Sequence, residues 1–380
     1  MTSSSAFYTE LIRKVFIQEG LEDSPLLGRA LERLPGVPVH TVRDREEIPA
    51  EDLHRHSLFV CKPRGRALAP CPGSRGHLCC AYLTLDLYLG CLLDCSYCIM
   101  RNYLNFSPLT VYLDPGQAVS RLASLAQANP DRLLRVGTGE VGDSLLLDPL
   151  FELSGALIRS LAGLENVALE LKTKTGFVDH LLDLEPKGNA VIGFSLNPEE
   201  FITAWEGRSS SLSDRLQAAR RAAASGYRLS FHFDPIILAP GWEERYRSVF
   251  AALRAIPASR VAWISLGALR YTPGLKETLG GQDLLLDEFV PCRDGKYRYL
   301  QGVRSAAYRH FARELSALFP APIYLCMESS AVWRNTFGKL PREITGVSAI
   351  FKKARGLSQG GFHERRRICP SRAGSAAGLR

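Results

Sequence analysis

Short apolar runs alternate with longer amphipathic stretches from residue 81 onward. The short runs are rich in Val, Leu, Ile and aromatic residues, as strands are, and the longer ones repeat apolar residues at helical spacing. The predicted strands are residues 81–89, 132–137, 167–172, 190–196, 228–234 and 261–267. The predicted helices are residues 115–128, 149–163, 176–184, 212–225, 241–255 and 300–318. Six strand–helix units in succession predict an α/β protein with a parallel sheet and helices outside it.

Both a doubly wound sheet and a full or partial barrel fit this pattern. Before residue 81 this alternation of short apolar runs and amphipathic stretches is missing. Phe7, Leu11, Val15 and Phe16 recur at helical spacing, so residues 1–60 are predicted to form a helix followed by loops. The next twenty residues hold Pro, Gly and Cys without periodicity. We therefore expect three segments, which are a helical and cysteine-rich segment (1–80), a barrel (81–330) and a C-terminal extension (331–380).

The composition is that of an ordinary globular protein, with 46% hydrophobic and 23% charged residues in 380. These values exclude a disordered chain, a collagen and a coiled coil. No apolar stretch reaches the roughly eighteen residues of a membrane helix, and no apolar leader opens the sequence. We therefore expect a cytoplasmic protein without a membrane contact. Nothing in the sequence requires an oligomer, and we expect a monomer.

The net charge of +8 is concentrated at the C-terminal end. A single acid, Glu364, stands there among the basic residues Lys352, Lys353, Arg355, Arg365, Arg366, Arg367, Arg372 and Arg380. A basic tail is compatible with a nucleic-acid partner. Surrounding Gly, Ser and Ala favour instead a solvated, partly disordered end.

Seven of the ten cysteines lie between Cys61 and Cys98, which random scatter would not produce. Three of them, Cys91, Cys95 and Cys98, have the spacing C-x3-C-x2-C directly after the first predicted strand. A structural zinc would need a fourth ligand, for which Cys79 or Cys80 is available. An iron–sulfur cluster is the alternative, because three thiolates around four irons leave one iron open to a substrate or cofactor.

The triplet, with the aromatic Tyr97 before its last cysteine, resembles the radical S-adenosylmethionine (SAM) superfamily. Further segments, in this order and spacing, are similar to its spore photoproduct lyase branch of DNA repair enzymes. They are Gly137–Glu140, Leu171–Lys174, Val178–Leu182, Gly193–Asn197, Ala224–Tyr227, Asp234–Ile236 and Gly241–Glu244. The resemblance spans residues 58–330.

The predicted strands place the same residues together without reference to any family. Each motif follows the end of a successive predicted strand. The motifs are the cysteine triplet, Gly137–Glu140, Lys172 with Lys174, Ser195 with Asn197, and Asp234. Chemistry in parallel α/β folds is found at the carboxyl ends of the strands. These residues are therefore expected at one mouth of the barrel.

The resemblance implies a partial (β/α)6 barrel in which Cys91, Cys95 and Cys98 form the catalytic site by binding a [4Fe-4S] cluster. SAM would bind the open iron and be cleaved reductively to a 5′-deoxyadenosyl radical, with the electron supplied by an external flavodoxin- or ferredoxin-type donor. Tyr97 would lie near the adenine and Lys174 near the methionine carboxylate. The remaining SAM-binding residues implied are Gly137, Thr138, Gly139, Glu140, Ser195 and Asn197.

The branch resemblance further implies a lyase that breaks a carbon–carbon bond in a DNA pyrimidine lesion. In that branch a cysteine after the second strand and a tyrosine after the third cluster cysteine return hydrogen to the product. Here the residue after Cys98 is Ile99, and no cysteine lies between Cys98 and Cys292. Cys292, Cys326 and Tyr103 are candidate substitutes. The alternative is a radical SAM enzyme for a modified nucleoside, a peptide or a metabolite.

Two other groups of residues leave alternatives open. Cys71, Cys79 and Cys80 either bind a second metal or pack as small apolar residues beside the triplet. Cations interleaved with Tyr297, Tyr299 and Tyr308 suit phosphate contact and base stacking, and equally suit one exposed helix face. The nucleic-acid-binding candidates are Arg293, Lys296, Arg298 and Arg304. A zinc-structured nucleic-acid-binding protein without enzymatic activity is a third hypothesis.

Overall fold

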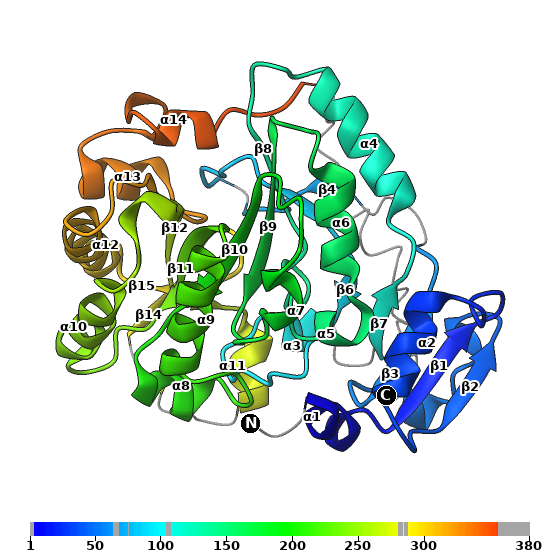
Figure 1. Cartoon of the computed structure of the whole chain (residues 1–380). Coiled ribbons are helices and arrows are strands. Elements are labelled where there is room, and N and C mark those ends of the chain that lie inside the picture. Colours follow the sequence, from blue (N-terminus) through cyan, green and yellow to red (C-terminus); the bar gives the residue numbers. More distant parts are fainter. Residues whose placement is uncertain are drawn as a thin grey trace, which may run out of the picture.

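An eight-stranded sheet forms the centre of the computed structural model, which describes residues 4–63, 68–74, 76–103, 108–279, 284 and 288–355. The strand order is β16-β12-β11-β10-β9-β8-β5-β4, and all neighbours are parallel except β4 and β5. The sheet curls into an open half-barrel (Figure 1). Its strands are β4 (Leu68–Pro70), β5 (Leu83–Leu85), β8 (Leu134–Gly137), β9 (Val167–Thr173), β10 (Ala190–Ser195), β11 (Arg228–Ile236), β12 (Val261–Ala268) and β16 (Ile323–Leu325).

Helices cover the outer side of this sheet, so the predicted partial barrel is confirmed (Figure 1). Helix α9 illustrates why, because Leu216, Ala219 and Ala223 lie buried on one of its faces. The predicted helix over residues 149–163 is divided in two at Glu152, where φ is 54°. The outer helices are α4 (Gly116–Gln127), α5 (Asp148–Phe151), α6 (Leu153–Leu161), α7 (Asp179–Leu182), α8 (Glu199–Trp205), α9 (Leu212–Ala224), α10 (Trp242–Leu253) and α12 (Gln301–Ser316).

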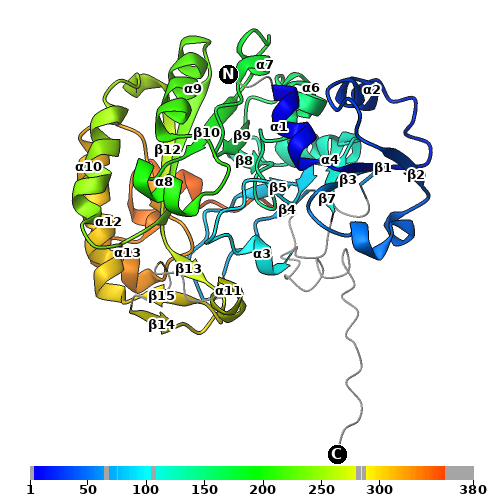
Figure 2. The same cartoon turned by 90° about the horizontal axis from the view of Figure 1, so that it is seen from below.

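The N-terminal layer contains a second sheet that the sequence analysis did not predict. Its strand order is β2-β1-β3-β7-β6, and it lies at one side of the barrel (Figure 2). The expected helix ends at Leu11, and Val15 and Phe16 belong to β1 instead, because this short apolar run is buried between two parallel strands. The elements are α1 (Ser4–Leu11), β1 (Lys14–Gln18), α2 (Pro25–Glu32), β2 (Val39–Val42), β3 (Ser57–Cys61), β6 (Tyr88–Leu89) and β7 (Leu109–Tyr112).

A small antiparallel sheet of β13, β15 and β14 comes between the barrel strands β12 and β16 in the chain. The remaining elements are α3 (Met100–Tyr103), β13 (Arg270–Tyr271), α11 (Pro273–Leu279), β14 (Phe289–Pro291), β15 (Tyr297–Tyr299), α13 (Ser330–Phe337) and α14 (Val347–Ile350), with short 3₁₀ turns at Arg45–Glu47, Ala50–Asp52, Ala258–Arg260 and Pro341–Glu343. In the part of the chain that the structure describes, no helix combines the length and apolarity needed to cross a bilayer. The basic tail beyond residue 355 lies outside the described residues.

Candidate active site

A cavity of about 300 Å³ opens at the carboxyl ends of the barrel strands. Its wall is built from the segments that follow successive strands: Gly139 follows β8, Lys174 follows β9, and Cys326 follows β16. Ser195 closes β10, and Asp234 lies near the end of β11. The five strand ends named in the sequence analysis therefore do meet at one place, as parallel topology requires.

The three cysteines of the triplet line this cavity from the loop of residues 91–98, called here the cluster loop. The loop curls because Asp94 adopts a φ of 61° and because the Cys98 amide donates to the Cys95 carbonyl at 3.2 Å. The Arg101 amide then donates to the Cys98 carbonyl at 3.1 Å as α3 begins. A sharply curled backbone is what lets closely spaced thiols face the same space.

A second segment, residues 205–208 after α8, braces the cluster loop through backbone contacts. The Ser96 amide donates to the Trp205 carbonyl at 2.8 Å, and the Arg208 amide donates to the Leu93 carbonyl at 2.7 Å. Between them, Gly207 has a φ of +56°, and a Cβ there would lie 2.3 Å from the Leu93 carbonyl oxygen. Only glycine fits this close approach of two backbones.

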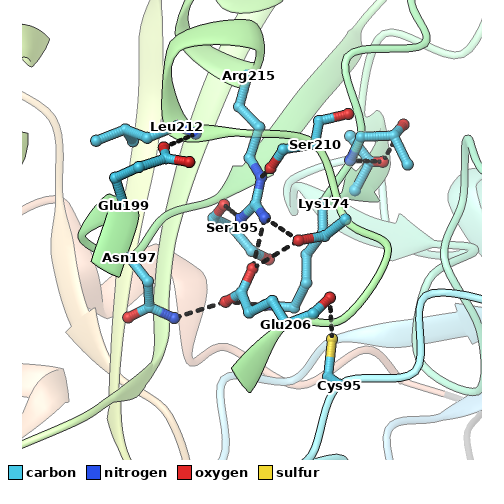
Figure 3. A network of polar contacts seen from close by, with 12 residues as sticks. Cys95, Lys174, Ser195, Asn197, Glu199, Glu206, Ser210, Leu212 and Arg215 are labelled. Carbon is cyan, nitrogen blue, oxygen red and sulfur yellow. Dashed lines mark hydrogen bonds and ion pairs between the residues drawn. The ribbon is translucent and has the colours of Figure 1, made fainter. Parts of the chain in front are cut away.

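The side chain of Glu206 organises the floor under the cluster loop (Figure 3). The carboxylate is fully buried and forms ion pairs with Arg215 and with Lys174, the latter at 3.4 Å. It also accepts hydrogen bonds from Asn197 Nδ2 at 2.7 Å and from the Tyr97 hydroxyl. The Glu206 carbonyl oxygen lies 3.7 Å from Cys95 Sγ, so the same residue supports the loop by backbone and by side chain.

Burial alone would raise the pKa of Glu206, but Lys174 and Arg215 outweigh it and lower that pKa to about 2. The residue is therefore ionised at every physiological pH. The sequence analysis missed Glu206 because it lies just after α8, in a stretch between residues 197 and 211 for which no element or motif was predicted. In the sequence, the one hint of a buried ion pair is that Glu206 stands nine residues before Arg215, an arginine of α9 that the fold buries.

The predicted SAM-binding residues divide into two groups. Tyr97, Gly139, Glu140, Lys174 and Ser195 line the cavity. The other three, Gly137, Thr138 and Asn197, lie behind its wall and are not among the lining residues. A Cβ on Gly137 would overlap the Tyr82 hydroxyl. The Thr138 hydroxyl forms a hydrogen bond with Ser144, and Asn197 Oδ1 accepts one from the Tyr246 hydroxyl at 2.6 Å. These three support the wall rather than touch the cavity.

The far side of the cavity from the cluster loop carries paired charges. Lys172 Nζ lies 3.9 Å from Glu140, and Arg270 binds the Asp234 carboxylate through both terminal nitrogens at 3.0 and 3.2 Å. Lys296 also lines the cavity, and its Nζ donates to Ser74 Oγ at 3.0 Å. Burial, and then the neighbouring Arg270, lower the pKa of Lys296. This wall therefore offers both signs of charge to a polar ligand.

Below this wall a buried polar network fills the barrel interior. The Glu170 carboxylate accepts hydrogen bonds from four side chains at 2.5 to 2.8 Å, which belong to Tyr82, Ser230, His232 and Trp263. Arg135 lies over the rings of Trp263 and Tyr324 at 5.0 and 4.9 Å from their centroids. Tyr324 belongs to the edge strand β16, whereas Tyr82 directly precedes β5, the second strand from the other edge, so this network connects the two sides of the half-barrel.

The donor set fits an iron–sulfur cluster better than a single metal ion. Among the described residues, no three His, Cys, Asp or Glu side chains are arranged to hold one ion. A cluster has no such requirement, because each thiolate binds a different iron. Burial raises the pKa of Cys91, Cys95 and Cys98. These thiols therefore stay protonated unless a bound metal centre displaces the proton. The structural-zinc alternative through Cys79 or Cys80 has no support in this geometry.

The other cysteines are distributed unevenly around the cavity. Cys71, Cys80 and Cys326 line it, whereas Cys79 and Cys292 do not. Cys71 Sγ lies 3.7 Å from Glu140, and Cys326 Sγ lies 3.8 Å from Arg270. Burial raises the pKa of both of these thiols, which keeps them protonated. The side chain of Tyr103 lies outside the described residues.

Two of the four nucleic-acid-binding candidates are engaged inside the protein. Arg298 binds both oxygens of Asp294 at 2.7 Å, and Arg304 binds Glu328 at 2.9 Å. Both guanidinium groups are buried, so neither is available to a phosphate, and the expectation for these two is wrong. Arg293 is exposed, and Lys296 lines the cavity.

The half-barrel with a triplet of cysteines at the mouth is the architecture of a radical SAM protein. A spore photoproduct lyase complexed with dinucleoside spore photoproduct has the same fold, with a TM-score of 0.71 at 23% identity over 83% of this chain and 98% of that one. A mutant of that enzyme with bound AdoMet and dinucleoside spore photoproduct matches with the same score and coverage at 22% identity.

The sequence comparisons define the family more closely. The profile described as spore photoproduct lyase matches residues 78–276, just over half of the chain, and the chain belongs to this family. It is 30% identical over 174 residues to the spore photoproduct lyase of a Geobacillus species, covering 46% of this chain and 51% of that enzyme. The enzyme of Bacillus subtilis matches at 29% over 167 residues. The chain thus spans about half the length of the curated relatives it matches.

Proposed function

We propose that the chain is an iron–sulfur enzyme that cleaves SAM reductively and acts on a pyrimidine lesion in DNA. One observation carries the proposal: three thiols, a lysine and a carboxylate converge on one cavity at the ends of parallel strands. Membership of the spore photoproduct lyase family supports a DNA lesion as the substrate. The fold neighbour complexed with dinucleoside spore photoproduct supports the same substrate class.

Each group around the cavity has a distinct task in this proposal. Cys91, Cys95 and Cys98 would hold the cluster, and Glu140 would attract the amino group of SAM, since a carboxylate suits an ammonium. Bound together, the cluster and SAM supply a radical that abstracts a hydrogen atom from the substrate. Lys174 would face the SAM carboxylate, while Glu206 holds the lysine in place at 3.4 Å.

A lesion enzyme must also accept a base extruded from the duplex, which requires stacking surfaces and phosphate contacts near the cavity. The three-stranded sheet beside the cavity carries aromatic rings, of which Phe289 and Tyr297 are partly exposed while Tyr271 and Tyr299 are buried behind them. Tyr271 and Tyr297 stack at 5.4 Å with an angle of 9°, and Phe289 and Tyr299 stack at 4.4 Å. Lys296 in the same sheet lines the cavity and suits a phosphate of the extruded nucleotide.

In this family a cysteine after the second strand returns a hydrogen atom to the product, and this chain has no cysteine there. The proposed reaction therefore needs another hydrogen donor. We expect the donor to be Cys326 or Cys71, because both thiols line the cavity and burial keeps both protonated. Cys292 does not line the cavity and serves as the matched comparison.

The test is anaerobic reconstitution with iron and sulfide, followed by reduction, addition of SAM and measurement of 5′-deoxyadenosine. Wild type should form it and Cys95→Ala should not, whereas Cys292→Ala should match wild type. A wild-type protein that takes up no iron and forms no 5′-deoxyadenosine would refute the proposal.

The substrate is tested separately from SAM cleavage. Dinucleoside spore photoproduct should be converted to thymines, and it should stimulate 5′-deoxyadenosine formation in wild type. SAM cleavage that is unaffected by the lesion would favour the alternative of a modified nucleoside, peptide or metabolite. Steep salt dependence of binding to UV-irradiated duplex DNA would support the DNA substrate.

A further inference from the structure

Three arginines meet one carboxylate on the cluster loop. Arg101 Nη1 lies 3.0 Å from Asp94 Oδ1, Arg208 Nη1 lies 3.6 Å from Asp94 Oδ2, and Arg55 pairs with Oδ1 as well. The three come from distant parts of the chain, namely the N-terminal layer, α3 and the segment after α8. Asp94 is the carboxylate that pairs with these arginines among the described residues, and it neutralises one of the three cations, which leaves two positive charges unbalanced there.

These charges face solvent rather than the cavity. The side chains of Arg55 and Arg208 are 41% and 47% exposed, and those of Arg101 and Asp94 are 25% and 30% exposed. None of the four residues lines the cavity. We call the surface of Arg55, Asp94, Arg101 and Arg208 the arginine patch.

The arginine patch is joined to the loop that carries the three thiols. Asp94 is the residue immediately before Cys95, and the backbone amides of Arg208 and Arg101 donate to the carbonyls of Leu93 and Cys98 at 2.7 and 3.1 Å. A positively charged surface on this loop attracts a partner of opposite charge to the part of the surface that borders the cysteine triplet. Association steered by charge is fast and weak, which suits a partner that delivers an electron and departs.

We propose that the arginine patch docks an acidic electron-carrier protein with a reduced flavin or iron–sulfur centre. The inference rests on the proposed function, because it requires a cluster at Cys91, Cys95 and Cys98. One electron leaves the carrier and one enters the cluster, and no bond or proton moves in the step. DNA is the less favoured partner, because the arginine patch is joined to the loop of the thiols and does not line the cavity that the lesion must enter; the test below distinguishes the two partners.

The test compares a protein carrier with a small reductant on the reconstituted full-length chain. The double variant Arg55→Gln, Arg208→Gln leaves Arg101 to pair with Asp94, so the loop keeps one ion pair. Stopped-flow absorbance measures cluster reduction by reduced flavodoxin and by photoreduced 5-deazaflavin, which is uncharged and needs no docking. The control variant is Arg247→Gln, Arg254→Gln on and after α10, which lies at the edge of the molecule away from α3 (Figure 1).

At low ionic strength, flavodoxin should reduce the double variant about tenfold more slowly than wild type, within the range that electrostatic steering produces. The difference should vanish at about 1 M salt, where the Debye length is about 3 Å. Deazaflavin should reduce all three proteins at one rate. Calorimetry on the proteins before reconstitution should show weaker flavodoxin binding by the double variant only.

Equal rates and equal affinities for wild type and double variant at low ionic strength would overturn the docking inference. So would a double variant whose reduction is unchanged but whose binding to UV-irradiated duplex DNA weakens, because the arginine patch would then be a DNA contact. A wild-type protein that assembles no cluster would overturn the proposed function, and the docking inference with it. If the reconstituted protein contains a cluster that deazaflavin reduces, the docking inference can fail without affecting the proposed function.

Discussion

Replacing Gly207 by alanine tests whether the segment after α8 really holds the cluster loop. The new Cβ would lie 2.3 Å from the Leu93 carbonyl oxygen and 2.9 Å from that of Asp94, both well inside ordinary contact distance. Because both atoms belong to backbone, no side chain can rotate away. Either the cluster loop or the segment of residues 205–208 must move.

The magnitude has two parts. Alanine at a φ of +56° costs about 1–2 kcal/mol because of its left-handed backbone. Forcing apart a well-packed contact adds about 1–3 kcal/mol. Gly338→Ala isolates the first part, since Gly338 caps α13 at a φ of +68° with no neighbour within 4 Å of a Cβ. The expected difference between the two variants is therefore about 1–3 kcal/mol, with Gly207→Ala the less stable.

Urea unfolding measures the difference, and iron content after anaerobic reconstitution measures the state of the cluster loop. Gly338→Ala should bind as much iron as wild type, whereas Gly207→Ala should bind less, because the carbonyls it displaces, those of Leu93 and Asp94, lie between Cys91 and Cys95 in the cluster loop. If the two variants unfold within about 0.5 kcal/mol of each other and load iron equally, residues 205–208 do not hold the loop, and the bracing described here is wrong.

Three further predictions follow from the buried groups. Glu206→Gln leaves two buried cations without their carboxylate and should lower the free energy of unfolding by about 3–5 kcal/mol, as measured in urea. Cys326→Ser or Cys71→Ser should preserve 5′-deoxyadenosine formation but lower the yield of repaired thymine, and Cys292→Ser should change neither. Burial alone would raise the pKa of Glu170, but His232, Arg135 and Ser230 together outweigh it and lower that pKa. The stability that the ionised carboxylate contributes is therefore complete above the unfolded pKa of about 4.3 and is lost as the pH falls toward the folded pKa. Thermal unfolding of Glu170→Gln should accordingly depend less on pH below that value than wild type does.

The barrel could be predicted because its strands and helices repeat at the length of a βα unit. Parallel connection then forces the carboxyl ends of the strands to one side, which is why Gly139, Lys174 and Ser195 reach one cavity. The N-terminal sheet was not predicted because its strands are short and separated in sequence. Val15 and Phe16 fit helical spacing with Phe7 and Leu11. They form a strand instead because they pair with β2 and β3, which the local pattern does not show.

Charged residues were harder to assign than apolar ones. Arg298 and Arg304 look like a basic surface in the sequence, yet Asp294 and Glu328 bury and neutralise them. Asp294 stands four residues before Arg298, so this pair was visible locally. Glu328, by contrast, is 24 residues from Arg304 and reaches it only through the fold. Charge counts along a chain do not distinguish a free cation from a paired one.

Glu206 shows how the cluster loop and the proposed SAM-binding wall depend on each other. Its carboxylate holds Lys174 and Tyr97, and its carbonyl oxygen lies against Cys95. Lys174 in turn lies 5.4 Å from the centre of the Tyr97 ring, so the lysine, the ring and the thiol share one fixed support. A displacement of any one is transmitted to the others, because groups that share a buried partner do not act independently. The residue that aligns the proposed cofactor site therefore touches neither substrate nor solvent, and it lies in a segment that carries none of the sequence motifs.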